Sequence, residues 1–144
     1  MRLLKIFVSM SILLGFINLN AQEIYLEIDK APSEIRAYVA THFPENKIVS
    51  IKKDQELNKL EYEVKLEKRI ELEFRSNYEI KKIESKSALP NSVIPEKVRA
   101  YVFKNYSPYK IVSWKQKSNK QEVELDNDWD LYFDLAGNFL RIDK

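Results

Sequence analysis

The chain has 144 residues, of which 44% are hydrophobic and 12% aromatic, so it carries enough apolar side chain for a packed core. It contains no cysteine, which excludes disulfide bonds, thiolate metal sites, thiol nucleophiles and a lipid-modified cysteine. Its 24 basic and 22 acidic residues give a formal net charge of +2, which does not indicate a nucleic-acid-binding protein.

The first 21 residues have the pattern of a signal peptide. Arg2 and Lys5 give a positive start, residues 6–17 form an apolar run, and Ala21 offers a small residue for cleavage. The run is too short for a comfortable membrane span, and a retained anchor is the alternative. We therefore expect an exported protein of the periplasm or the extracellular space, with no membrane span in the mature chain. Without residues 1–21, the chain has 22 basic and 22 acidic residues and is formally neutral.

The rest of the sequence contains two tetrapeptides that each occur twice. Residues 36–39 and 99–102 both read Arg-Ala-Tyr-Val, and residues 47–50 and 110–113 both read Lys-Ile-Val-Ser. Both pairs are 63 positions apart. Such internal repetition indicates two copies of one supersecondary unit.

A short strand and two amphipathic helices are the first elements that the sequence predicts. Residues 23–28 alternate between apolar and polar side chains, as a half-buried strand does. Pro32 and Pro95 are each well placed for a first helical turn, and Pro44 and Pro108 for a helix end. The residues that follow at i, i+3, i+4, i+7 and i+8 form one helical stripe in each copy: Ile35, Tyr38, Val39, His42 and Phe43, and Val98, Tyr101, Val102, Asn105 and Tyr106.

Four strands are predicted after each helix from the period-two alternation of apolar side chains. They cover residues 47–51, 62–66, 70–74 and 80–83 in the first copy, and 110–114, 121–125, 129–133 and 139–142 in the second. Polar loops are predicted at 52–59 and 115–120, and hairpin turns at 67–69 and 126–128. The offset between the copies falls from 63 to 59 because the second loop is shorter, a change that surface loops absorb easily.

The predicted fold is α+β, with two tandem repeats that each hold a helix and a four-stranded antiparallel sheet. The helices pack on one sheet face, because alternating strands bury one side only. We expect an N-terminal strand and repeat 1 in residues 22–84, a linker in 85–93, and repeat 2 in 94–144. The two sheets either join or pack side by side. The predicted core residues are Tyr38, Val39, Val64, Leu66, Phe74, Tyr101, Val102, Val123, Leu125 and Phe133.

The order of these elements resembles a known family. Each copy runs from a proline through the helix and an aromatic residue to Lys-Ile-Val-Ser, Glu-Val-x-Leu, a turn and a strand ending in Leu-x-Phe. Over residues 31–143, the chain resembles the PepSY-like, beta-lactamase-inhibitor-like domain of exported bacterial proteins. The resemblance implies helix-on-sheet modules in tandem and an association with inhibiting or escorting proteases, but it brings no motif of functional residues. The first copy departs from the pattern at Arg75 and Tyr78, where the second has Asp134 and Gly137.

No catalytic constellation stands out in the sequence. His42 is the only histidine, which excludes a histidine-based triad or a site with several histidines within one chain. We expect it to be a packed or partly exposed residue near a helix end. Ser50 and Ser113 lie inside predicted strands without a nucleophile-elbow motif, and Trp114 and Trp129 are expected in the core. We therefore predict no catalytic residue and no cofactor.

One acidic run has a metal-like spacing. Asp126, Asp128 and Asp130 recur at i, i+2 and i+4, as at the start of a Ca²⁺-binding loop. The match then fails, because Leu131 and Gly137 stand where such a loop needs glycine and glutamate. We interpret the run as a solvated hairpin turn, with the three aspartates as weak metal candidates only.

Charge is unevenly distributed in the second copy. Residues 97–120 hold seven basic residues and no acid, and residues 122–134 hold six acids and no base. Strand alternation places one set of these side chains on the face away from the core: Glu122, Glu124, Asp130, Tyr132 and Asp134. This face is either a docking surface for a basic patch of another protein or an ordinary charged face that discourages edge pairing.

Three functional hypotheses follow. The first is an exported, non-enzymatic binding module that presents a β-sheet face to another protein, including as an inhibitor of an envelope or secreted enzyme. The alternative is a small-ligand or divalent-cation carrier of the cell envelope, suggested by the acidic residues. An enzyme is the third and least supported hypothesis.

Overall fold

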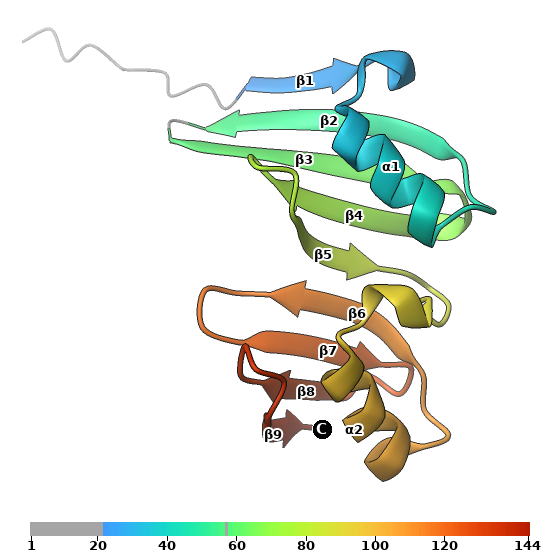
Figure 1. Cartoon of the computed structure of the whole chain (residues 1–144), viewed down its shortest axis with the longest axis vertical. Helices are drawn as coiled ribbons and strands as arrows, with labels where there is room; N and C mark the ends of the chain where they lie inside the picture. Colours follow the sequence, from blue (N-terminus) through green and yellow to red (C-terminus); the bar gives the residue numbers. More distant parts are fainter. Residues whose placement is uncertain (1–21, 57) are drawn as a thin grey trace, which may run out of the picture.

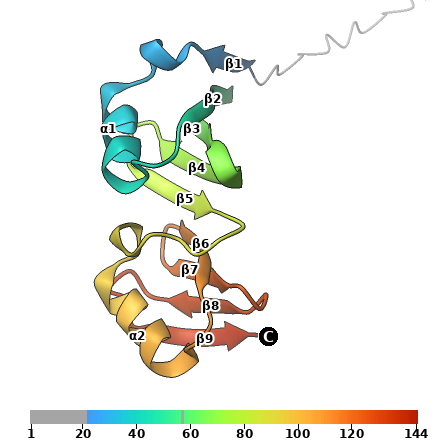
Figure 2. The same ribbon diagram turned by 90° about the vertical axis from the view of Figure 1, so that its right-hand side faces the viewer.

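A computed structural model describes residues 22–56 and 58–144, and within them nine antiparallel strands form a single sheet in sequential order (Figure 1). The strands are β1 (Gln22–Leu26), β2 (Ile48–Glu56), β3 (Lys59–Leu66), β4 (Ile70–Arg75), β5 (Ile80–Glu84), β6 (Ile111–Gln116), β7 (Gln121–Leu125), β8 (Asp130–Phe133) and β9 (Phe139–Asp143). The helices α1 (Ser33–His42) and α2 (Glu96–Tyr106) lie on the same face of the sheet (Figure 2). The 3-10 helices are η1 (Ile28–Lys30), η2 (Glu67–Arg69) and η3 (Asn91–Val93). The predicted signal peptide lies outside the described residues.

The two halves of the molecule are joined by the pairing of β5 with β6. At the centre of this antiparallel pair, Ile83 lies opposite Trp114, and both side chains are buried. The hydrophobic core therefore continues from one half into the other under an unbroken sheet. The sequence left this arrangement open.

Each helix begins after a proline and packs one stripe of side chains against the sheet. Pro32 and Pro95 occupy the N-cap positions of α1 and α2, where the fixed φ of proline suits the start of a helix. The side chains buried from these helices are Ile35, Val39, Val98 and Val102. In the described part of the chain, no helix is long and apolar enough to cross a membrane.

The sheet has the same irregularities in both halves. The pairing of β2 with β3 shifts register at Val49, and the pairing of β6 with β7 shifts at the equivalent Val112. A second shift falls immediately before Phe74 in the β4–β5 pair and immediately before Phe133 in the β8–β9 pair. Bulges at matching positions bend both halves in the same way.

The packing of the aromatic side chains also repeats. The ring of Tyr38 meets the ring of Phe74 edge to face, with centroids 5.4 Å apart and planes at 88°. In the second half, Tyr101 meets Phe133 at 5.5 Å and 84°. Such edge-to-face contacts are a favoured aromatic geometry. The tyrosines of the two Arg-Ala-Tyr-Val segments thus make the same contact between helix and sheet.

Of the predicted core residues, the two tyrosines are partly buried and pack against the core. The others are buried: Val39, Val64, Leu66, Phe74, Val102, Val123, Leu125 and Phe133. Burial also raises the pKa of the Tyr38 phenol.

The predicted polar loop at residues 52–59 is wrong, because β2 continues to Glu56 and β3 starts at Lys59. This stretch pairs with β1 on one side and β3 on the other, so tertiary hydrogen bonds override its polar composition. Lys52 also forms ion pairs with Glu23 at 3.2 Å and Glu63 at 3.0 Å.

Candidate functional site on the open face of the sheet

The face of the sheet opposite the helices carries mostly charged side chains, because alternation along the strands sends the apolar side chains to the helix face. Strand pairing arranges the open-face residues in rows that run across the sheet. The first row consists of Lys52, Glu63, Glu73, Lys82, Lys115, Glu122, Tyr132 and Arg141. The second row consists of Ser50, Lys65, Glu71, Glu84, Ser113, Glu124, Asp130 and Asp143.

Ion pairs neutralise most of the first row. Besides the pair of Lys52 with Glu63, the Lys82 ammonium lies 3.4 Å from the Glu73 carboxylate. Burial acts to raise the pKa of Glu63, but hydrogen bonding and the charge of Lys52 outweigh it and hold the pKa below its usual value. Most charged side chains of the first row therefore have an ion-pair partner.

Two of the predicted docking residues belong to this neutralised row. Glu122 accepts a hydrogen bond from Lys117 Nζ at 2.8 Å, and although burial opposes it, the net effect lowers the pKa of Glu122. The Tyr132 ring is only 9% exposed. The Arg141 guanidinium lies over it at 3.9 Å from the ring centroid, and Lys120 at 4.7 Å. Cations of this chain therefore cover the tyrosine.

Two other predicted docking residues face one another in the second row. Glu124 lies opposite Asp130 across the β7–β8 pair, and Asp130 lies opposite Asp143 across the β8–β9 pair. Burial raises the pKa of Glu124, and the nearby charges of Asp130, Asp128 and Glu84 raise it further. Burial and neighbouring acids likewise raise the pKa of Asp130. Like charges directly opposite each other are destabilising, so this arrangement is retained at a cost to the fold.

Asp134, the fifth predicted docking residue, lies apart from the others. It follows the last residue of β8, and its carboxylate accepts hydrogen bonds from the Asn138 backbone N–H at 2.8 Å and from Asn138 Nδ2 at 2.7 Å. These bonds lower the pKa of Asp134. Its carboxylate holds the β8–β9 turn.

Two of the predicted weak metal candidates have structural roles in the β7–β8 hairpin. Asp126 Oδ1 accepts a hydrogen bond from the Lys110 backbone N–H at 3.1 Å, as Glu67 does from Lys47 at 3.2 Å in the first half. The same structural bond thus explains both acids. Asp128 occupies the left-handed turn position, with φ 64°. Among the described residues, no group of three or more metal-ligating side chains could hold an ion.

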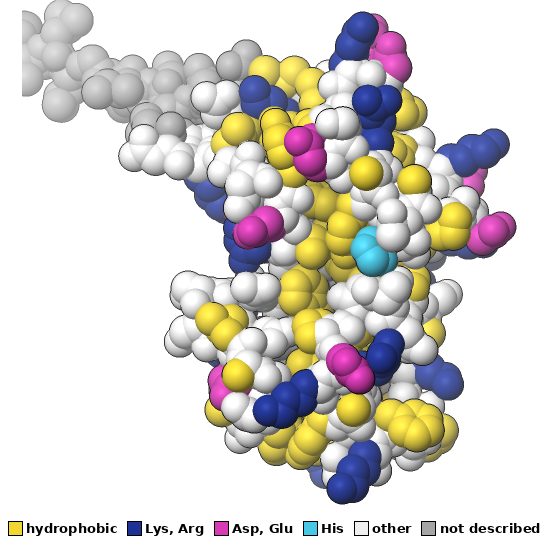
Figure 3. Space-filling model, viewed as in Figure 1, with side chains coloured by type: hydrophobic (Ala, Val, Ile, Leu, Met, Phe, Trp, Pro, Cys, Tyr) yellow, Lys and Arg dark blue, Asp and Glu magenta, His cyan; other side chains and the backbone are white. Residues whose placement is uncertain are grey.

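The helix face is more apolar than the open face. Figure 3 shows hydrophobic side chains gathered between and beside the helices, with the single histidine among them. His42 Nδ1 lies 3.0 Å from Ser92 Oγ, and its ring lies 4.4 Å from the Tyr38 ring. This histidine joins α1 to the segment between the two halves.

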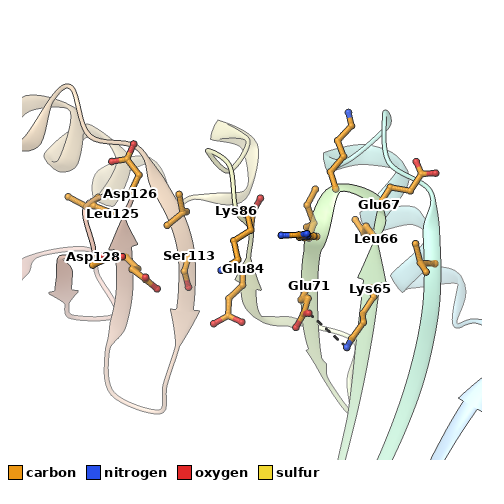
Figure 4. Close-up of a pocket in the computed structure, with 17 residues that line it drawn as sticks. Lys65, Leu66, Glu67, Glu71, Glu84, Lys86, Ser113, Leu125, Asp126 and Asp128 are labelled. Atoms are coloured by element: carbon orange, nitrogen blue, oxygen red, sulfur yellow. Dashed lines mark ion pairs between the residues drawn. The ribbon is translucent and has the colours of Figure 1, made fainter.

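A groove of about 780 Å³ opens on the open face where the two halves meet (Figure 4). The β3–β4 hairpin forms one wall and the β7–β8 hairpin the other. Residues at the end of β5 and the start of β6 form the floor, including Glu84, Ser85, Lys86, Val112 and Ser113.

The two walls of this groove differ in net charge. The β3–β4 wall carries Lys65, Lys68 and Arg69 together with Glu67 and Glu71, and we call it the basic wall. The β7–β8 wall carries only acids, Glu124, Asp126 and Asp128, and we call it the acidic wall. The basic wall lies in the first copy, whereas the uneven charge distribution that stands out in the sequence lies in the second copy. An alignment of the two copies would have revealed the basic wall, since Lys65 aligns with Glu124 and Arg69 with Asp128.

Comparisons with solved structures reveal the same fold in proteins of Bacteroides that are described as periplasmic. A protein from Bacteroides thetaiotaomicron described as a "putative calcium-regulated periplasmic protein" is 24% identical, with a TM-score of 0.80 over 85% of this chain and 97% of that one. A protein from Bacteroides vulgatus described as a "putative periplasmic protein" is 28% identical, with a TM-score of 0.79 over 85% of this chain and 97% of that one. Another from the same species, described as of unknown function, is 29% identical, with a TM-score of 0.79 over 85% and 100%.

The family comparison matches the sequence twice. The family described as "Putative beta-lactamase-inhibitor-like, PepSY-like" matches residues 17–82 and again residues 61–141. Together the two matches extend over most of the chain and support the tandem arrangement. No curated protein matches the sequence.

Proposed function

The chain belongs to the PepSY-like family, and from this premise we propose that it is an exported, non-catalytic module that binds another protein through the open face of its sheet. The periplasmic proteins that share its fold support export. The family description supports a binding role, with inhibition of an envelope or secreted enzyme as its specific form.

The observation that carries this proposal is the unneutralised part of the open face. In the described residues, Glu124 and Asp130 have no ion-pair partner, although most of the neighbouring row is paired. Acids held opposite each other at a cost to stability gain a favourable partner when a basic surface docks on them. An ordinary solvated face has no such requirement, because single solvated charges suffice to discourage edge pairing.

Capture of a partner from the exporting compartment tests the proposal. The wild-type protein and the double variant Glu124→Lys/Asp130→Lys serve as bait. A matched control, Glu79→Lys/Glu96→Lys, makes the same change in net charge at exposed positions in the β4–β5 turn and on α2. We expect one specific partner with wild type and control, and its loss with the open-face variant. Equal recovery by all three, with unchanged circular dichroism, contradicts the proposal.

The chain organisation predicted from the sequence is part of the same proposal. Removal of residues 1–21 after export leaves a mature protein that starts at Gln22, with repeat 1 up to residue 84, a linker at 85–93 and repeat 2 at 94–144. Mass spectrometry of the exported protein checks the cleavage site. A protein that retains residues 1–21 at the membrane contradicts this part.

The second candidate is a divalent-cation carrier. The opposed pair of carboxylates, Glu124 and Asp130, favours it, as does the description of one structural relative as calcium-regulated. Isothermal titration calorimetry with Ca²⁺ measures whether the protein binds this ion. An ion that binds only the folded protein raises its melting temperature, so the absence of both heat and a melting shift at millimolar Ca²⁺ removes this candidate.

A further inference from the structure

We propose that the groove between the β3–β4 and β7–β8 hairpins binds an extended segment of the partner protein that carries one basic and one acidic side chain about four residues apart. This inference rests on the proposed function and names the chemistry that the open face selects.

The charges of the two walls come from equivalent positions in the two halves. Lys65 near the end of β3 and Glu124 near the end of β7 occupy equivalent positions. Arg69 and Asp128 occupy equivalent positions in the turns that follow these strands. Both turn residues have the left-handed conformation, with φ 60° and 64°. The backbone is therefore matched, and the walls differ in charge.

Part of the charge of each wall is available to a ligand. Within residues 22–56 and 58–144, no ion pair joins one wall to the other. Lys65 forms an ion pair with Glu71 of its own half at 3.9 Å (Figure 4). It also lies 3.4 Å from Glu63, and about half of its side chain remains exposed. Lys68, Arg69 and Asp128 are exposed at the tips of their turns. A ligand with both signs of charge would complement both walls together.

The strand spacing sets the distance between the charges of that ligand. The walls begin at β4 and β7, which are three strand positions apart in the sheet. At about 4.8 Å for each position, the walls are roughly 14 Å apart. An extended chain advances about 3.3 Å per residue, so roughly four residues span this distance. Side chains at i and i+4 of an extended segment point to the same side, toward the groove.

The floor of the groove combines short and long side chains. Ser85 and Ser113 are short, and Ser113 is only 8% exposed, whereas Glu84 and Lys86 are long and charged. A single zwitterionic amino acid is too short to reach both walls, whereas a segment of about five residues is long enough. These lengths favour a peptide over a small molecule.

Peptides of defined charge test the groove directly. The probe is a fluorescently labelled, blocked Ser/Thr peptide with Lys at i and Glu at i+4, and its binding to the full mature chain is followed by anisotropy at low salt. The comparison peptides carry Lys at both positions, Glu at both positions, or Lys and Glu side by side. We expect the i, i+4 mixed peptide to bind about tenfold more tightly than any other, the effect of two favourable charge contacts.

Reversal of the walls provides the matched variants, since each reversal introduces the residues of the equivalent positions. Lys65→Glu/Arg69→Asp makes both walls acidic and should shift the preference to the Lys–Lys peptide. Glu124→Lys/Asp128→Arg makes both walls basic and should shift it to the Glu–Glu peptide. The combination of all four substitutions exchanges the walls and should restore binding of the mixed peptide. Arg36→Asp/Lys104→Glu, on the exposed helix surfaces, controls for net charge.

Equal affinities for mixed and like-charged peptides overturn the inference, as does failure of the fourfold variant to regain mixed-peptide binding while its circular dichroism matches wild type. Equally tight binding of free lysine or glutamate also overturns it, in favour of a small ligand. If a partner is captured through Glu124 and Asp130 while the peptides fail, the proposed function stands without the groove. If capture fails and the peptides bind as expected, the groove stands without that partner.

Discussion

The two halves of the molecule share their inner face and differ on their outer face. Tyr38 and Phe74 in the first half make the same contact as Tyr101 and Phe133 in the second, within 0.1 Å in centroid distance. At the groove, the equivalent outer positions carry Lys65 in one half and Glu124 in the other. The inner face is constrained by close packing, in which a change of one methylene is felt. The outer face contacts solvent, so a change of charge there costs less stability than a change of shape in the core.

The largest expected effect concerns the shared inner face. Phe74→Ala and Phe133→Ala each remove a fully buried ring that packs on a helix tyrosine. Each substitution should lower the free energy of unfolding by about 3–5 kcal/mol. Because one sheet and one core join the halves, we expect a single unfolding transition in denaturant for both variants. Two separate transitions, or a large loss in only one variant, would break the equivalence of the halves.

A turn that differs between the halves provides the next effect. Gly137 has φ 82°, and an added Cβ would lie 3.1 Å from Lys97 Cβ, whereas Tyr78 holds the equivalent position with φ 66°. Gly137→Ala should cost about 1–2 kcal/mol, because L-residues disfavour this conformation. The exposed neighbour Ala136→Ser is the control and should change the melting temperature little. A Gly137→Ala variant as stable as wild type would show that both turns accept a side chain equally.

The bonds at the hairpin ends provide a smaller and symmetrical effect. Glu67→Ala and Asp126→Ala remove side-chain acceptors of the Lys47 and Lys110 backbone N–H groups, respectively. Each should cost about 1 kcal/mol in chemical denaturation. Glu45→Ala, at an exposed turn position, is the control. Clearly unequal losses would argue that these two acids have different roles.

The smallest effect separates neighbouring acids of β7 and depends on pH. The pKa of Glu122 is lowered and that of Glu124 is raised. Glu122 therefore stabilises the fold above its unfolded pKa, and this contribution is lost as the pH falls through its lower folded pKa. The ionised form of Glu124 costs stability above its raised folded pKa, and this cost disappears as the pH falls below its unfolded pKa.

Glu122→Gln should accordingly destabilise the protein at pH 7 by about 0.5 kcal/mol, and Glu124→Gln should stabilise it by a similar amount. Both differences should vanish in acid. Denaturant titrations of the two variants at neutral and acidic pH measure the signs. If both substitutions changed the stability at pH 7 in the same direction, the hydrogen bond from Lys117 and the charge of Asp130 would not account for a difference between Glu122 and Glu124.

Much of the fold could be predicted because its signals are local. The stripe after Pro32 and Pro95 and the alternation around Val64 and Val123 each lie within a few residues of chain. The open-face placement of Glu122, Glu124 and Asp130 follows from the same alternation. The sequence predicts a loop at residues 52–56, although these residues form a strand. Their partners in β3 lie 3 to 11 positions away, and those in β1 lie about 30 positions away. Their polar composition gives no local sign of that pairing.

The candidate site was harder to predict than the fold. Alternation carries no information beyond the end of a strand, so it could not place Asp134 in a turn with Asn138. It also could not show that Arg141 covers Tyr132, because that contact depends on the register between two strands. The basic wall lies in the first copy, about 60 residues before the acidic wall, and only the pairing of β5 with β6 brings them together.

The sequence by itself determined the duplicated unit, the two striped helices, the buried faces of the strands and the absence of cysteine chemistry. These properties depend on the identity and spacing of residues close together in the chain. Only the tertiary structure decided that the halves share one sheet, which carboxylates are neutralised, and that walls of opposite net charge enclose a groove. Those properties depend on distances between segments far apart in the sequence, and backbone hydrogen bonds across the sheet fix these distances.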